Sequence, residues 1–107
     1  MIQEIQRQLA ELIAENSKGS TALFDAERAL AEAEYDLDLA EQKAYIKSQG
    51  TVRDREAMAR LESADLRLQR DLRKAELNRI RQKIRSIETA SMVLATQAKL
   101  MGQETRL

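Results

Sequence analysis

The sequence predicts an all-α protein: a long two-helix hairpin or coiled coil with a short N-terminal helix, assembling as a homo-oligomer. The 107 residues contain no proline and only three glycines, and they are rich in helix-forming residues. Apolar residues recur at seven-residue intervals. Apolar content is 43%, but sixteen of these residues are alanine. Because alanine buries little area, we expect association between chains to supply much of the stability.

The composition argues against most enzymatic chemistry. Histidine and cysteine are absent, so the chain has no imidazole base, thiolate nucleophile or disulfide. We therefore expect no enzyme, no cofactor and no metal site. Charges at Glu4, Arg7 and Glu11 argue against a signal peptide, and the longest uncharged run, Thr89 to Ala98, has ten residues and is too short to span a bilayer. We expect a cytoplasmic protein that does not enter membranes.

The first half of the chain carries one apolar seam within a single predicted domain, 1–107. Its two heptad series are Ile2, Leu9, Asn16, Leu23, Leu30, Leu37, Ala44 and Ile5, Leu12, Gly19, Ala26, Ala33, Ala40, Lys47. The polar run 16–20 interrupts the seam without changing its register. Either one helix is weakened there or two helices are separated, and we favour a short helix over about 2–15 and a long one over 20–49. Ser20 or Thr21 is a suitable N-cap for the second of these.

A turn is predicted around Gly50, because the run 48–51 reads Ser-Gln-Gly-Thr. Glycine readily adopts the left-handed conformation that ends helices. Thr51 and Asp54 have the spacing of a capping pair, so a second long helix is predicted over 52–101.

The second long helix carries two apolar stripes that point in different directions. The first stripe, which we take as the core, is Ala57, Leu61, Ala64, Leu68, Leu72 and Ala75; the second is Leu77, Ile80, Ile84, Ile87, Ser91, Leu94, Ala98 and Met101. The second stripe is rotated by roughly 120° from the first. Either the helix bends near 75–80 or its C-terminal half packs on something else, for which we predict another copy of the chain. The predicted oligomerisation residues are Leu77, Ile80, Ile84, Ile87, Leu94, Ala98 and Met101.

Charge is divided unequally between the two halves. Residues 1–49 carry ten acidic and five basic side chains, whereas residues 50–107 carry eight acidic and thirteen basic ones. Five cations recur every seven residues and form a basic line roughly opposite the first apolar stripe: Arg53, Arg60, Arg67, Lys74 and Arg81. Arg70 and Arg85 lie beside this line. In one interpretation the acidic helix simply packs against the basic one. In the other, this basic line binds phosphates of a nucleic acid.

The layout of the chain resembles the phage recombination mediators of the UvsY type. The resemblance lies in a short amphipathic N-terminal segment, a long helix ending in Tyr45 and Gly50, a polar turn, and a second helix with an uncharged end at 86–101. Gln42-Lys43-Ala44 stands where that family has a Lys-x-Arg pair, which leaves Lys43 and Lys47 as cations there. The chain is also similar to small secreted helical hairpins with a Trp-x-Gly turn, but Ser48 stands in place of the tryptophan.

The resemblance to the mediators implies a ring-like homo-oligomer that binds single-stranded DNA. It further implies that the protein helps to load a recombinase in place of a single-strand-binding protein, in the host cytoplasm if a phage encodes it. The predicted nucleic-acid-binding residues are Lys43, Lys47, Arg53, Arg60, Arg67, Arg70, Lys74, Arg81 and Arg85. Contacts to phosphate do not distinguish DNA from RNA. The alternative is a structural or scaffolding coiled coil that binds only other proteins.

Overall fold

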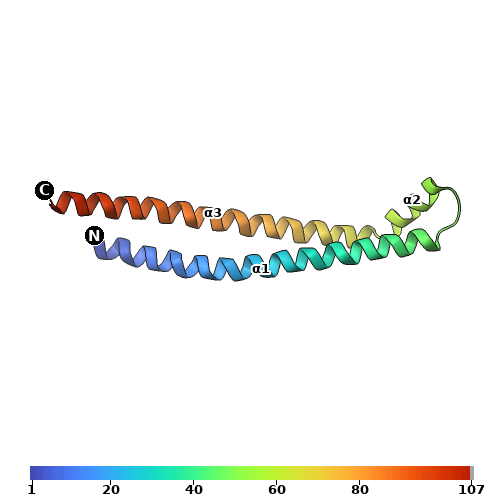
Figure 1. Cartoon of the computed structure of the whole chain (residues 1–107), viewed down its shortest axis with the longest axis horizontal. Coiled ribbons are helices and arrows are strands. Elements are labelled where there is room, and N and C mark those ends of the chain that lie inside the picture. Colours follow the sequence, from blue (N-terminus) through green and yellow to red (C-terminus); the bar gives the residue numbers. More distant parts are fainter. Residues whose placement is uncertain (107) are drawn as a thin grey trace. The chain divides into compact units, whose positions relative to one another are not determined.

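The computed structural model describes residues 1–106, with side chains up to Gly102, and its regular structure is helical. Helix α1 spans Ile2–Lys47, α2 spans Val52–Glu62 and α3 spans Ala64–Arg106 (Figure 1). None of the described residues lies in a strand, which confirms the all-α prediction. Within the described part of the chain, no helix is long and apolar enough to cross a membrane.

The predicted break at 16–20 is wrong, because α1 continues through it to Lys47. The predicted helices over 2–15 and 20–49 are therefore one helix. The hydroxyl of Ser20 donates to the carbonyl oxygen of Asn16 at 3.2 Å, so this polar residue is accommodated without breaking the helix. Gly19 also has a packing role: a Cβ added to it would lie 3.1 Å from Cγ1 of Ile84 on α3. A glycine that lets two helices approach closely is compatible with a continuous helix.

The predicted turn at Gly50 and the predicted cap at Thr51 are confirmed. Gly50 has a φ of +114°, a region that side chains with a Cβ rarely adopt. The Thr51 hydroxyl accepts a hydrogen bond from the backbone N–H of Asp54, and the Asp54 carboxylate accepts one from the backbone N–H of Thr51. This reciprocal capping box fixes the start of α2 directly after the turn.

An interruption at Ser63, which the sequence did not predict, divides the second long helix into α2 and α3. Ser63 has φ −97° and ψ 10°, outside the helical range, and it is 1% exposed. Its hydroxyl donates to the carbonyl oxygen of Ala59 at 2.6 Å, which satisfies a buried polar group. By contrast, α3 runs without interruption through 75–80, where a bend was one of the predicted alternatives.

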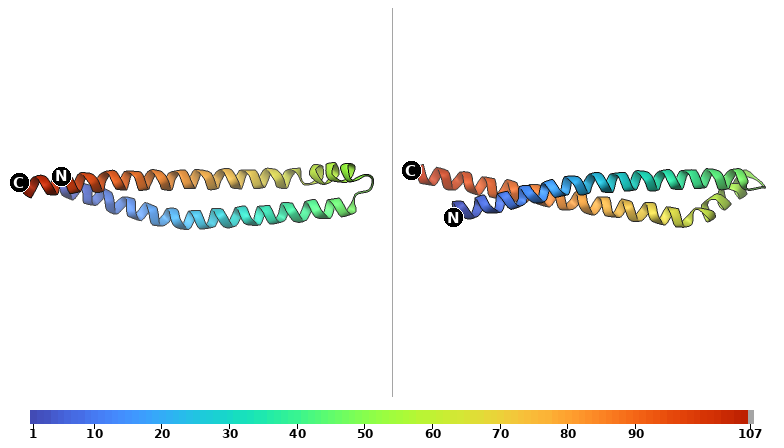
Figure 2. Two further views of the ribbon diagram at one scale, coloured as in Figure 1. Left: turned by 45° about the horizontal axis from the view of Figure 1, so that its top comes forward. Right: turned by 90° about the horizontal axis from the view of Figure 1, so that it is seen from below.

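The chain forms two compact units. The turn unit is Asp25–Asn78, and the terminal unit is Met1–Phe24 with the part of α3 that begins at Arg79. In the turn unit, the later part of α1 lies beside α2 and the start of α3 (Figures 1 and 2). In the terminal unit, the first part of α1 lies beside the last part of α3 (Figure 2).

Large aliphatic residues fill the interior of the terminal unit. Ile5 and Ile87 are buried, and Ile80, Ile84 and Leu94 are half-buried. The second predicted stripe of the long helix therefore faces α1 of the same chain instead of being left free for another copy. Ala98 and Met101 on this stripe are also half-buried. Assembly through this stripe stays a prediction.

Small residues fill much of the interior of the turn unit. Ala26 and Ala44 on α1 and Ala59 on α2 are buried, together with Leu37 and Leu77. The first predicted stripe is outside this core, because Leu61, Leu68 and Leu72 are 72%, 56% and 53% exposed. Its prediction as the core is therefore wrong. The buried alanines Ala44 and Ala59 allow the helices to approach closely, and Leu61, Leu68 and Leu72 lie on the other side of their helices.

Candidate nucleic-acid interface

The predicted basic line is only partly free in the turn unit. Arg53, Arg60 and Lys74 are exposed, and their side chains have no ion pair among the described residues. Arg67 is half-buried and faces α1. The sequence predicted that the whole line points away from the core, but Arg67 instead faces the acidic helix α1.

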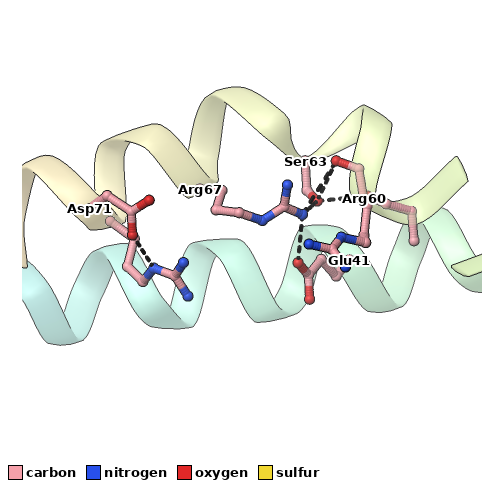
Figure 3. Close-up of polar contacts among 7 residues, drawn as sticks. Glu41, Arg60, Ser63, Arg67 and Asp71 are labelled. Carbon is pink, nitrogen blue, oxygen red and sulfur yellow. Dashed lines mark hydrogen bonds and ion pairs between the residues drawn. The ribbon is translucent and has the colours of Figure 1, made fainter. Parts of the chain in front are cut away.

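Arg67 bridges the two sides of the turn unit (Figure 3). Its Nη2 lies 3.1 Å from Oε1 of Glu41 on α1, and the two side chains are 26% and 38% exposed. The same nitrogen donates to the carbonyl oxygen of Arg60 and the hydroxyl of Ser63, both at 3.3 Å. The Glu41 carboxylate offsets the positive charge of Arg67 within the fold. The other two hydrogen bonds satisfy the Arg60 carbonyl and the Ser63 hydroxyl at the interruption between α2 and α3. Arg67 is thus a structural residue rather than a free phosphate ligand.

Arg70 is also half-buried and engaged. Its Nε lies 3.0 Å from Oδ1 of Asp71, and its side chain lines a hollow with Glu34, Asp38 and Glu41. Three carboxylates from α1 near one guanidinium leave little net positive potential there. The predicted role of Arg70 as an exposed nucleic-acid ligand does not fit this surrounding.

Carboxylates also surround Arg60. It lines a concave region of about 530 Å³ with Asp38, Glu41 and Glu56. This arrangement matches the interpretation in which the acidic and basic helices have complementary flanks. Nucleic-acid phosphates approaching Arg60 would meet these carboxylates as well.

The cations predicted on α1 are separated from the basic line. Lys43 and Lys47 are exposed, and no described residue forms an ion pair with them. Lys47 lines a different hollow from Arg60, together with Asp54, Met58 and Glu62. The structure thus does not place Lys47 and Arg60 at one site.

Tyr45, the aromatic residue near the end of α1, is engaged by Arg55. The guanidinium of Arg55 lies 4.4 Å from the centre of the Tyr45 ring, and its nitrogens donate to the Tyr45 carbonyl oxygen at 3.1 and 3.2 Å. This cation–π contact covers one face of the ring. It also ties the end of α1 to the start of α2 across the Gly50 turn.

The clearest group of free cations lies in the terminal unit. Lys18 from α1 and Arg79 and Lys83 from α3 line one hollow of about 250 Å³, with Glu15 as its single carboxylate. All three cations are exposed and have no ion pair among the described residues. We call this group the cationic hollow. Arg81 and Arg85, which were predicted as ligands, are exposed on the neighbouring turns of α3.

The sequence does not reveal the cationic hollow for two reasons. Lys18 is 61 positions from Arg79, so only the pairing of α1 with α3 brings them together. Arg79 and Lys83 are four residues apart and therefore share a helix face, but they lie off the seven-residue line that drew attention. The i, i+4 spacing was the one signal in the sequence that pointed to them.

No protein-family model, no curated protein and no solved structure matches this chain. Among the described residues there is also no group of acidic side chains arranged to hold a metal ion.

Proposed function

We propose that this protein is a non-enzymatic accessory protein that binds single-stranded nucleic acid through the cationic hollow. The observation that supports this is the convergence of Lys18, Arg79 and Lys83 from two helices on one hollow with a single carboxylate. Free cations gathered on one surface bind phosphates and release counterions. DNA is the preferred ligand on the resemblance to the UvsY-type mediators.

The whole proposed role is that of a cytoplasmic recombination mediator working as a homo-oligomer. One copy has no net charge, so three cations give only weak binding at physiological salt. An oligomer repeats the cationic hollow, and several weak contacts to one strand act together. The mediator would then help a recombinase to displace a single-strand-binding protein from the strand.

A charge-matched pair of variants tests the binding surface. In the first variant Lys18, Arg79 and Lys83 become glutamine; in the control Arg28, Arg73 and Lys99 do, with the same change in net charge. Binding to a labelled single-stranded oligonucleotide is measured over a salt series. We expect the first variant to bind more weakly and its log–log salt slope to fall by about 2, since each phosphate contact on a single strand contributes about 0.7. The control should resemble the wild type.

Two outcomes contradict the proposal. One is that the wild-type protein shows no binding at low salt, and the other is that both variants lose affinity equally. The mediator role has a separate measurement: assembly of a recombinase on a strand already covered by single-strand-binding protein should become faster when this protein is added. Unchanged assembly with intact nucleic-acid binding would limit the function to binding.

The second candidate function is a scaffolding protein that binds only proteins. It is favoured by the exposed leucines of the turn unit, which are typical of a protein-binding surface. In that case the glutamine variants leave partner binding unchanged.

A further inference from the structure

The cationic hollow of the terminal unit has an apolar lining as well as its charges. Besides the charged residues, it is lined by Gly19 and Ala22 on α1 and by Ile80, Ile84 and Ile87 on α3. Ile87 is 7% exposed, and Ile80 and Ile84 are half-buried, so the isoleucines form the bottom of the hollow. A surface that only attracts phosphates needs no such lining. We call these five residues the apolar floor.

Small residues on α1 keep the hollow open. Gly19 has no side chain, and a Cβ at this position would lie 3.1 Å from Cγ1 of Ile84. Ala22, three residues further along α1, adds only a methyl group. The hollow has a volume of about 250 Å³. Because a cavity of about 150 Å³ accommodates benzene, the hollow has room for one planar ring system.

The cations of the hollow come from both of the helices that form it. Lys18 belongs to α1, whereas Arg79 and Lys83 belong to α3, so an occupant of the hollow has cations on two sides. With a single carboxylate beside these three cations, the lining has a net positive charge.

Other carboxylates that are close in sequence have cations of their own. Glu11 pairs with Arg7 on α1, and Glu76 pairs with Arg73 on α3. These ion pairs offset the negative charges that lie nearest along each helix. The positive charge of the hollow is therefore available to an anionic ligand.

A nucleotide within a single strand matches this combination of floor and charge. Its base is a flat ring system, and one phosphate lies on the 5′ side of the nucleotide and another on the 3′ side. When the base lies on the apolar floor, Lys18 can meet one phosphate while Arg79 or Lys83 meets the other. An anionic amphiphile with one charged end, such as a fatty acid, would use the cations of one side only.

We infer that one base of the bound strand enters the cationic hollow and lies on the apolar floor, with its two flanking phosphates held by cations of the two helices. This inference rests on the proposed function. It supplies a physical reason for preferring single strands, since a base in a duplex is paired and stacked and must first be moved out of the stack. The floor has no polar side chain, so it accepts any of the bases.

Strands with and without bases separate this inference from the proposed function. A labelled mixed-sequence strand is compared with an abasic strand of the same length and the same number of phosphates. We expect the wild-type protein to bind the strand with bases about fivefold more tightly, because the hollow removes part of one base from water. Equal affinities would overturn the inference and leave the proposed function standing. No binding of either strand at low salt would overturn both.

A duplex of the same sequence gives an independent comparison. It has a higher density of phosphates, so contacts with phosphate alone favour the duplex, whereas insertion of a base favours the single strand. We expect the single strand to bind more tightly throughout the salt series. Tighter binding of the duplex would contradict the inference.

A variant that fills the hollow locates the base. Ala22→Leu adds bulk without changing the charge, and leucine is a good helix former. The control is Ala10→Leu, which alters an exposed alanine of α1 outside the hollow. We expect Ala22→Leu to bind strands with and without bases equally, whereas Ala10→Leu keeps the fivefold preference. Circular dichroism should show both variants to be as helical as the wild type. A preference that survives in Ala22→Leu would place the base elsewhere and overturn the inference.

Photochemical labelling reports the position of the base without any substitution. A strand with a diazirine on one base should label residues 19–22 and 80–87 of the wild-type protein, and labelling confined to other segments would overturn the inference. Dodecyl phosphate represents the competing class of ligand. If it binds to the wild-type protein while no strand does, the hollow holds an anionic amphiphile and the inference is wrong.

Discussion

The two units of this chain differ in the size of the residues that fill their interiors. In the terminal unit large aliphatic residues, among them Ile5 and Ile87, fill the interior, although Ile13, Val93 and Leu100 are exposed. In the turn unit the small residues Ala44, Ala59 and Ser63 fill much of the interior beside Leu37 and Leu77, and the leucines of the first stripe lie outside: Leu61, Leu68 and Leu72. The distance between two helices depends on the side chains at their contact, so small residues allow close approach and large ones require space. Apolar character alone therefore does not identify which face of a helix forms the core.

The units also differ in how they use charge. In the turn unit, Arg67 and Glu41 form an ion pair between helices. In the terminal unit, Arg7 pairs with Glu4 and Glu11 along one helix. The first arrangement helps to hold two helices together, whereas the second stabilises a single helix. Lys18, Arg79 and Lys83 of the terminal unit form no ion pair with any residue that the structure describes.

The largest effect is expected from matched truncations in the two units. Ile87→Ala should lower the free energy of unfolding by about 2–4 kcal/mol, because it removes buried methylene groups and leaves a cavity. Leu68→Ala should change it by less than about 0.5 kcal/mol at concentrations where the chain is monomeric, because Leu68 is 56% exposed. Urea denaturation measures both. Equal losses for the two variants would contradict the assignment of inner and outer faces.

A smaller effect is expected for the ion pair between the helices. Arg67→Gln, Glu41→Gln and the double variant form a mutant cycle, for which we expect a coupling of about 0.5–1 kcal/mol, since both side chains are partly exposed. The Arg28–Glu32 pair within α1 is the control, with side chains 69% and 64% exposed. Its coupling should be no more than about 0.5 kcal/mol. A coupling of zero for Arg67 and Glu41 would show that the pair holds no helices together.

The smallest effect is expected at the exposed start of α1. A hydrogen bond from Arg7 lowers the pKa of the Glu4 carboxyl below its ordinary value of 4.5. Its contribution to stability is thus fully present above about pH 4.5 and is lost as the pH falls through the lowered pKa. An NMR titration should show the Glu4 pKa rising in Arg7→Gln and staying unchanged in Arg28→Gln. Identical titration in all three proteins would rule out this interaction.

Much of the fold was predictable from local sequence signals. Composition indicated helices, and Gly50 with the Thr51–Asp54 spacing indicated the turn and its cap, because these features act over a few residues. The interruption at Ser63 was not predictable, since neither proline nor glycine marks it. Gly19 suggested a break, but it lies inside a helix. A Cβ at this position would crowd Ile84 of α3, so glycine here allows close packing.

The candidate site was less predictable than the fold. A seven-residue line of cations is visible in the sequence, but its relation to the acidic helix depends on which of two apolar stripes faces inward. In the structure the second apolar stripe, and not the first, faces inward. Arg67 therefore lies against Glu41 of α1. The cationic hollow depends on pairing between distant segments, which local patterns do not encode.

The composition of the terminal unit has a consequence for the order of events during translation. Residues of the first helix that lie near Ile5 pair with a segment that begins at Arg79, so the ribosome must complete most of the chain before their partners exist. Contacts across the Gly50 turn, such as that between Tyr45 and Arg55, span only ten residues and form early. The nascent protein should therefore fold from its middle outward, with its two ends joining last.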